Sequence, residues 1–258
     1  MEGFALDEAG VERFVPLWVR GGFPRSLLAR TEAASVSWRR EFVRSFVERD
    51  LPQLGSTVSA ATISRFFSML AHYHGQIWNA SEFARAFGVS EPSVRRYADL
   101  LTETFVVRKL APWSENLGKR QVKSPKLYIT DTGILHTLLG VDDRAGLDRH
   151  PKVGASWESF GITQVVERLG ASRDECYFWG TQAGAELDLL VVRGERRLGF
   201  EFKRTVAPQV TKSMHIARED LRLSSLDVVH AGDQTFPLRQ GIRALALKNI
   251  LTDLKPLR

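Results

Sequence analysis

The sequence predicts a mixed α+β (α/β-type) protein with a helical N-terminal part, a helix-turn-helix unit in the middle and an α/β domain at the C-terminal end. The first 54 residues carry apolar side chains at helical spacing. The middle part contains two helical segments separated by the glycine-bearing turn Gly88-Val89-Ser90, which is typical of a helix-turn-helix. The last part reads as a helix, three strands, a helix and a strand. We therefore expect three parts, at 1–54, 55–148 and 149–258.

The composition is that of an ordinary globular protein and excludes several classes. With 258 residues, 43% of them hydrophobic and 26% charged, the chain has room for two domains or one large one. No apolar run approaches the roughly 18 residues that a membrane span requires, and the N-terminus lacks the basic and then apolar pattern of a signal peptide. The single cysteine, Cys176, excludes an internal disulfide and a cysteine-based zinc cluster. We expect a cytoplasmic protein without a membrane partner.

The N-terminal segment is predicted to be helical and to carry no chemistry of its own. Residues Val36–Leu51 place an apolar stripe along a helix whose other positions are rich in arginine and glutamate. The stripe consists of Trp38, Phe42, Phe46 and Val47. Residues Leu17–Pro24, which contain a Gly-Gly pair, read as a turn-bearing connector.

Residues 55–113 predict a winged-helix unit. A first helix, Ile63–His74, has one apolar face. A second helix begins after Asn79, with Glu82 as its capping-box partner, and ends near Gly88. The third helix and the strand that follows it are expected at Glu91–Thr104 and Phe105–Leu110.

Cations on the third helix and on a later loop are candidates for nucleic-acid binding. The net charge of +6 is compatible with such a partner but does not require one. In a DNA-binding unit, the third helix would offer Ser93, Arg95 and Arg96 to the duplex; alternatively, the two arginines are solvated helix residues. The loop adds spaced cations that suit phosphate contacts, at Lys119, Arg120, Lys123 and Lys126.

The Gly118-Lys119 pair in this loop is not part of an ATP-binding P-loop. Trp113 stands where the first glycine of that motif belongs, and Arg120 replaces its serine or threonine. We find no other P-loop in the sequence, so we expect no ATP binding of that kind.

The C-terminal part alternates helices and strands after a charged linker at Gly140–Lys152, which follows a short helix. Most of the strands are short and bounded by turn residues, and the helices show apolar positions at helical spacing. The expected elements are helices at Thr132–Leu139, Ala155–Leu169 and Pro208–Leu223, and strands at Cys176–Trp179, Glu186–Val192, Arg197–Arg204 and Leu226–Ala231.

The hairpin at Glu186–Arg204 is the stretch with the clearest chemistry. A tight turn at Gly194-Glu195 would place Asp188 opposite Glu201 and Glu186 opposite Lys203, all on one face. The other face would be wholly apolar and consist of the pairs Leu187 with Phe202, Leu189 with Phe200, and Val191 with Leu198. A shift of one residue would scramble both faces, so the clean separation supports this register.

Two carboxylates in direct opposition repel each other, and a divalent cation between them would relieve that repulsion. The alternative is that Asp188 and Glu201 belong to a solvated charged face of an amphipathic hairpin. Glu158 has two interpretations as well. It lies near the start of the preceding helix, where it could reach toward a metal or could simply be favoured by the helix dipole.

The order Asp188, Glu201-Phe202-Lys203 resembles the D…(D/E)-x-K signature of the PD-(D/E)XK nuclease superfamily, and the predicted order of elements is similar to its restriction-endonuclease-like core. The resemblance implies that Asp188 and Glu201 hold Mg²⁺ or Mn²⁺ together with the Phe202 carbonyl. It also implies that Lys203 positions water or stabilises developing charge, and that Glu158 is an additional catalytic acid. Two further polar residues, Glu186 and Gln182, would either support the site or lie on the surface.

A broader set of ordered blocks resembles domain-of-unknown-function family 4143, the C-terminal portion of predicted bacterial and archaeal AAA+-type ATPases. The blocks are Gly21–Pro24, Glu48–Leu51, Lys123–Tyr128, Asp131–Gly133, Trp157–Phe160 and Gly184–Asp188. Members of that group usually carry an N-terminal ATPase domain, and this chain is expected to begin just after it. It would then be a stand-alone protein, a degraded gene or a cloned fragment, and the ATPase activity does not carry over.

These observations predict metal-dependent hydrolysis of a phosphodiester in DNA, with RNA as the alternative substrate. A second hypothesis is a non-catalytic module in which the winged helix binds DNA or a protein. A third is that the chain serves only to anchor or regulate an AAA+-type ATPase partner.

Overall fold

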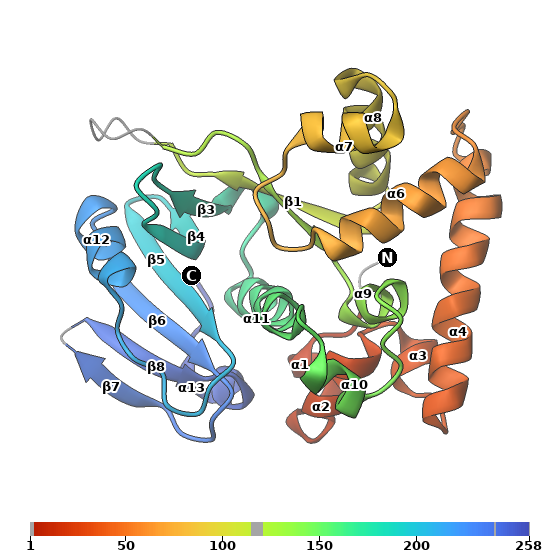
Figure 1. Cartoon of the computed structure of the whole chain (residues 1–258). Coiled ribbons are helices and arrows are strands. Elements are labelled where there is room, and N and C mark those ends of the chain that lie inside the picture. Colours follow the sequence, from red (N-terminus) through yellow and green to blue (C-terminus); the bar gives the residue numbers. More distant parts are fainter. Residues whose placement is uncertain (1–2, 115–120, 240, 258) are drawn as a thin grey trace. The chain divides into compact units, whose positions relative to one another are not determined.

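The computed structural model describes residues 3–114, 121–239 and 241–257 (Figure 1). It divides into two compact units, each of which consists of several separate stretches of the chain. The first consists mainly of Glu12–Lys109 and Leu127–Ser159, and the second of Ala5–Val11, Leu110–Lys126 and the chain from Phe160 onward. Within these described stretches, no helix combines the length and the apolar content that crossing a bilayer demands.

The N-terminal segment is helical, as predicted. Its helices are α1 (Leu6–Ala9), α2 (Phe14–Arg20), α3 (Pro24–Leu27), α4 (Glu32–Ser45) and α5 (Leu51–Gln53), with one π-helical turn at Phe46–Asp50 between the last two. The expected connector at Leu17–Pro24 is wrong for its first half, because α2 continues to Arg20. The chain turns only at Gly21, where φ is +79° and where a Cβ would collide with the Asp131 carboxylate.

The three helices predicted around the Gly88 turn are present as α6 (Ala60–His72), α7 (Ala80–Phe87) and α8 (Glu91–Glu103). Side chains of Ser59, Asn79 and Ser90 accept hydrogen bonds from backbone amides in the first turns of the three helices. Gly88 ends α7 in the left-handed conformation. The capping box expected at Glu82 is wrong, because that carboxylate accepts a hydrogen bond from the Tyr73 hydroxyl instead.

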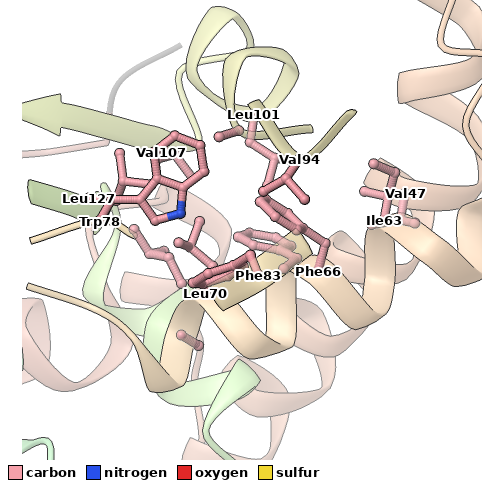
Figure 2. Packing of buried hydrophobic residues seen from close by; sticks show 14 of the residues in the cluster. Val47, Ile63, Phe66, Leu70, Trp78, Phe83, Val94, Leu101, Val107 and Leu127 are labelled. Atoms are coloured by element: carbon pink, nitrogen blue, oxygen red, sulfur yellow. The ribbon is translucent and has the colours of Figure 1, made fainter. Parts of the chain in front are cut away.

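One apolar cluster holds these helices together (Figure 2). Phe66 of α6, Phe83 of α7 and Val94 of α8 are completely buried and meet at its centre. The apolar spacing of α8 does not extend to Phe105, which is 50% exposed and has a φ of +63°. The following strand therefore begins two residues later than predicted, as β1 (Val107–Pro112).

The region between the helical cluster and the C-terminal sheet contains one more helix than expected. It consists of β2 (Lys126–Ile129), α9 (Thr132–Leu138), α10 (Arg144–Arg149) and α11 (Val153–Leu169). The predicted linker at Gly140–Lys152 is wrong over α10, because Asp143 caps this helix and its own residue Leu147 is fully buried.

The second unit contains most of an eight-stranded mixed sheet with the order β2-β1-β3-β4-β5-β6-β8-β7. Strands β3, β4 and β5 are antiparallel neighbours, β5, β6 and β8 are parallel neighbours, and β7 is antiparallel to β8. The expected helix, three strands, helix and strand are all present, and β7, β8 and α13 were not predicted. The bounds are β3 (Cys176–Gly180), β4 (Glu186–Arg193), β5 (Arg196–Lys203), α12 (Lys212–Asp220), β6 (Ser225–His230), β7 (Phe236–Arg239), β8 (Ile242–Ala246) and α13 (Ile250–Asp253).

Helices cover both faces of the central strands in this unit. Met214 and Ala217 of α12 pack with Leu190 and other apolar residues of one face. On the other face, Phe202 of β5 packs so closely against Gly161 of α11 that a Cβ at Gly161 would overlap its ring. The β4–β5 hairpin is therefore fixed from both sides.

Candidate active site

The β4–β5 hairpin has the predicted register over most of its length. Its backbone pairs run from Arg193–Arg196 at the turn to Leu189–Phe200. Gly194, the first central residue of the turn, has a φ of +58°, as the expected tight turn requires. Phe200 and Phe202 are buried, as predicted for the apolar face.

The hairpin departs from the prediction at Asp188, where β4 contains a β-bulge. Tyr177 of β3 pairs with Leu190, but Trp179, two residues on, pairs with Leu187, so β4 holds one extra residue there. The expected direct pair of Asp188 and Glu201 is wrong, because regular pairing with β5 stops at Leu189. Bulges of this kind re-aim side chains and are frequent beside active sites.

The bulge also changes the face to which Leu187 belongs. Leu187 shares an apolar cluster with Leu190, and a Cβ at Gly199 would lie 3.2 Å from it. The prediction that Leu187 lies on the face of Phe202 is therefore wrong. The remaining two apolar pairs, which lie between the bulge and the turn, are confirmed.

The Asp188 carboxylate is buried, and it binds a backbone amide of β5. Its side chain accepts a hydrogen bond at 2.9 Å from the Phe202 amide to Oδ2, and the residue is 4% exposed. A residue of an antiparallel ladder directs its N–H and its C=O toward the same neighbour. The Phe202 carbonyl is therefore directed toward β4 as well, on the side of Asp188.

The Glu201 carboxylate is buried with one oxygen bound and one oxygen unbound. Lys203 Nζ lies 2.7 Å from Glu201 Oε1, whereas Oε2 has no hydrogen-bond partner among the residues that the structure describes. Burial, and secondly the charge of Asp188, raise the pKa of Glu201 to about 7, against a smaller opposing effect of Lys203. Burial raises the pKa of Asp188 too, and Lys126 and the Phe202 amide oppose that rise.

These facts exclude a solvated charged face for the two central acids, since both are at least 95% buried. A partly solvated charged face does describe the neighbouring polar residues. Glu186 and Lys203 are half-buried, and Gln182 is exposed. An unsatisfied carboxylate oxygen in a buried pair of acids is costly unless a cation or a proton compensates it.

Lys126 lies at the carboxylate pair, although its position in the sequence grouped it with the other cations of the predicted loop. It was expected to contact nucleic acid, but it is buried at the start of β2. Its Nζ lies 3.8 Å from Asp188 Oδ1 and 3.6 Å from Glu186 Oε1. No local pattern could have revealed this position, because the contact joins strands that are far apart in the chain.

Glu158, the additional acid expected at the metal, lies in the first unit on α11. Its carboxylate accepts a hydrogen bond from the buried Tyr128 hydroxyl at 2.5 Å. The helix-dipole interpretation is wrong, because the first turn of α11 contains no acidic residue. The observed partner of Glu158 is therefore a tyrosine of β2.

Of the other described residues predicted to contact nucleic acid, Arg95, Arg96 and Lys123 are exposed and Ser93 is half-buried. On α8, Arg95 lies 3.4 Å from Glu91 and over the Trp78 ring. The Arg96 guanidinium is 3.5 Å from the Ser93 hydroxyl. Lys119 and Arg120 lie outside the described residues.

The donor set at the hairpin suits a hard divalent cation. Two buried carboxylates, an unbound Glu201 oxygen and a backbone carbonyl directed toward β4 are oxygen ligands of the kind that Mg²⁺ takes, along with water and substrate phosphate. Among the residues with assigned positions, no group of three or more histidine, cysteine, aspartate or glutamate side chains is arranged to hold a metal. Water and substrate would therefore have to complete the coordination.

Comparison with known proteins finds relatives over almost the whole chain. Residues 153–250 match the family described as Domain of unknown function (DUF4143), which confirms the predicted resemblance for the C-terminal part. The chain is 46% identical over 252 residues to the uncharacterized proteins Mb2031c of Mycobacterium bovis and Rv2008c of Mycobacterium tuberculosis.

The aligned region covers 98% of this chain and 57% of each of these mycobacterial relatives. No solved structure matches the chain significantly. Residues 11–145, more than half of the chain, match the family described as Domain of unknown function (DUF8612). The C-terminal part is similar to DUF4143 proteins over residues 153–250, and the protein belongs to the DUF8612 family.

Proposed function

We propose that the protein is a divalent-metal-dependent phosphodiesterase that acts on nucleic acid at the bulged end of the β4–β5 hairpin. The observation that carries this proposal is the buried pair of Asp188 and Glu201, with Glu201 Oε2 lacking a partner among the described residues. Two lysines flank the pair, and a positive charge beside the acids suits an anionic phosphate. The order of residues along β4 and β5 supports the PD-(D/E)XK interpretation.

Asp188, Glu201 and the Phe202 carbonyl would hold Mg²⁺ or Mn²⁺. A metal there supplies a Lewis acid for the phosphate and lowers the pKa of a bound water. The Phe202 amide already holds the Asp188 carboxylate in place. Lys203 adjoins Glu201 and is 44% exposed, so its ammonium can reach a phosphate or orient a water.

The helix-turn-helix of α7 and α8 would bind the nucleic acid as a winged-helix module. The exposed cations Arg95, Arg96 and Lys123 support this assignment, and Lys119 and Arg120 belong to the same proposal. The spaced cations Lys119, Arg120 and Lys123 suit phosphate contacts, which carry little sequence information. We propose DNA as the substrate, with RNA as the alternative.

A second candidate function is a non-catalytic module that regulates or anchors an AAA+-type ATPase. What supports it is the resemblance of the ordered sequence blocks to the C-terminal portion of predicted AAA+-type ATPases. Under this proposal, the carboxylate pair would be a structural remnant and α7–α8 would contact protein. The two functions differ in one respect that is easily measured: only the first predicts cleavage by the purified protein.

The first prediction is cleavage that depends on both acids. Purified protein should cut plasmid or single-stranded DNA with Mg²⁺ or Mn²⁺ and stop when the metal is chelated. Asp188→Asn and Glu201→Gln should each lower the rate by at least about a hundredfold, because each removes a charged metal ligand at nearly constant size.

The matched control is Glu195→Gln, which removes an exposed acid from the turn of the same hairpin and should leave the rate unchanged. Cleavage that survives in both carboxylate variants would contradict the proposed site. A wild-type protein that is inert with every metal and substrate would favour the non-catalytic module.

A further inference from the structure

Lys126 is buried beside the carboxylate pair and carries a positive charge where a divalent cation would bind. Its side chain is 5% exposed, and Nζ lies 3.8 Å from Asp188 Oδ1 and 3.6 Å from Glu186 Oε1. The ammonium also lies 5.5 Å from the centre of the Phe178 ring. A charge this deeply buried requires partners, and these two carboxylates provide them.

The two distances to the carboxylates exceed the length of a hydrogen bond, so the ammonium compensates charge without holding either acid in a fixed geometry. The orientation of Asp188 comes instead from the Phe202 amide, 2.9 Å from Oδ2. Lys126 therefore acts on Asp188 through its charge.

The second lysine of the site is different. Lys203 contacts Glu201 at 2.7 Å, but its side chain is 44% exposed and can turn toward solvent or a ligand. Lys126 has almost no solvent to turn toward. Lys203 is therefore accessible to a substrate, whereas Lys126 is enclosed beside the acids.

We propose that Lys126 is an internal counter-ion of the carboxylate site, with which a divalent cation must compete for Asp188. The inference rests on the proposed metal site, and it concerns how that site is loaded. In the metal-free protein, the ammonium stabilises a buried acid that would otherwise be uncompensated. When a metal binds, the same ammonium repels it at close range and weakens its affinity.

The test compares Mn²⁺ affinity by titration calorimetry in the full chain, with no substrate present. Lys126→Met removes the charge at similar size and should bind Mn²⁺ at least about tenfold more tightly than wild type. Lys126→Arg keeps the charge and should remain within about threefold of wild type. The matched control is Lys123→Met, which removes an exposed charge from the same segment and should have no effect.

A second measurement follows the metal-free state. Lys126→Met should lower the melting temperature of the metal-free protein, and adding Asp188→Asn should recover most of that loss, because the uncompensated charge is then gone. This double variant also covers the case in which Lys126→Met alone does not fold. A loss that is simply additive would contradict the proposal.

The outcomes separate this inference from the proposed function. Equal or weaker Mn²⁺ binding by Lys126→Met would overturn the counter-ion alone, since the metal site would still exist. Absence of Mn²⁺ binding in wild type, Lys126→Met and Lys126→Arg would overturn both. Tighter binding by Lys126→Met, with the control variant unchanged, would establish the competition.

Discussion

At the scale of single residues, the behaviour of Glu201 follows from its burial. An acid whose pKa is raised in the folded protein holds a proton that the unfolded chain has already released. The raised pKa of about 7, against an ordinary value of 4.5, therefore concerns stability as much as chemistry. Metal binding in the neutral range would require Glu201 to give up this proton.

The second prediction is that the metal-free protein loses stability as the pH rises. Below about pH 4.5, Glu201 is protonated in both the folded and the unfolded protein. Above about pH 7 it is charged in both, and the folded protein then has to bury that charge. The free energy of unfolding should therefore fall between these values, by roughly 3 kcal/mol at most from this group. Urea denaturation of wild type and Glu201→Gln at several pH values measures the difference. An equal pH dependence in both proteins would contradict the assignment.

At the scale of elements, local signals predicted what is locally determined. The helices α6, α7 and α8 follow from apolar periodicity and from the caps at Ser59, Asn79 and Ser90. The hairpin register follows from the turn at Gly194. These features depend on residues within a few positions of one another, which is why sequence patterns contain them.

The features that were missed depend on distant partners. The bulge at Asp188 belongs to the pairing of β4 with β3, in which the register shifts by one residue between Tyr177 and Trp179, and the turn of the β4–β5 hairpin carries no signal for it. Lys126 reaches the acids only through the fold. Strand β7 is short and contains Pro237, so its pattern gave little signal.

The third prediction concerns the packing of α11 on β5, which positions the end of the hairpin. Gly161→Ala should destabilise the protein by about 1–3 kcal/mol, because its Cβ would overlap the Phe202 ring. Gly154→Ala on the same helix is the matched control: apart from its chain neighbours and the backbone of its own helix, nothing lies within 4 Å of the added Cβ, and alanine favours the helix. Thermal unfolding of both variants checks this, and equal stability would contradict the packing.

At the scale of the whole molecule, the chain is described by two family matches and by the share of its relatives that it covers. The DUF8612 match covers residues 11–145 and the DUF4143 match covers 153–250. The chain spans 57% of the mycobacterial relatives. We propose the nuclease from the hairpin, the winged helix from α7–α8, and an AAA+-type partner from the resemblance of the sequence blocks.

The fourth prediction tests nucleic-acid binding by the whole chain. Affinity for duplex DNA should fall steeply with salt, because binding to phosphates releases counterions. Replacing Lys119, Arg120 and Lys123 with alanine should flatten the salt slope by about one unit for each phosphate that is no longer neutralised. Fluorescence anisotropy across a salt series measures the slope, and an absence of binding at low salt would contradict the proposal.

The most direct test of the central claim is an Mn²⁺ soak of crystals, with anomalous scattering recorded at the manganese edge. We predict one strong peak within coordination distance, about 2.2 Å, of carboxylate oxygens from both Asp188 and Glu201. Crystals of Asp188→Asn should lose that peak while the hairpin keeps its course. A structure in which the ordered carboxylate pair holds no manganese, or in which the metal binds only elsewhere, would contradict the claim that this bulged hairpin is a metal site.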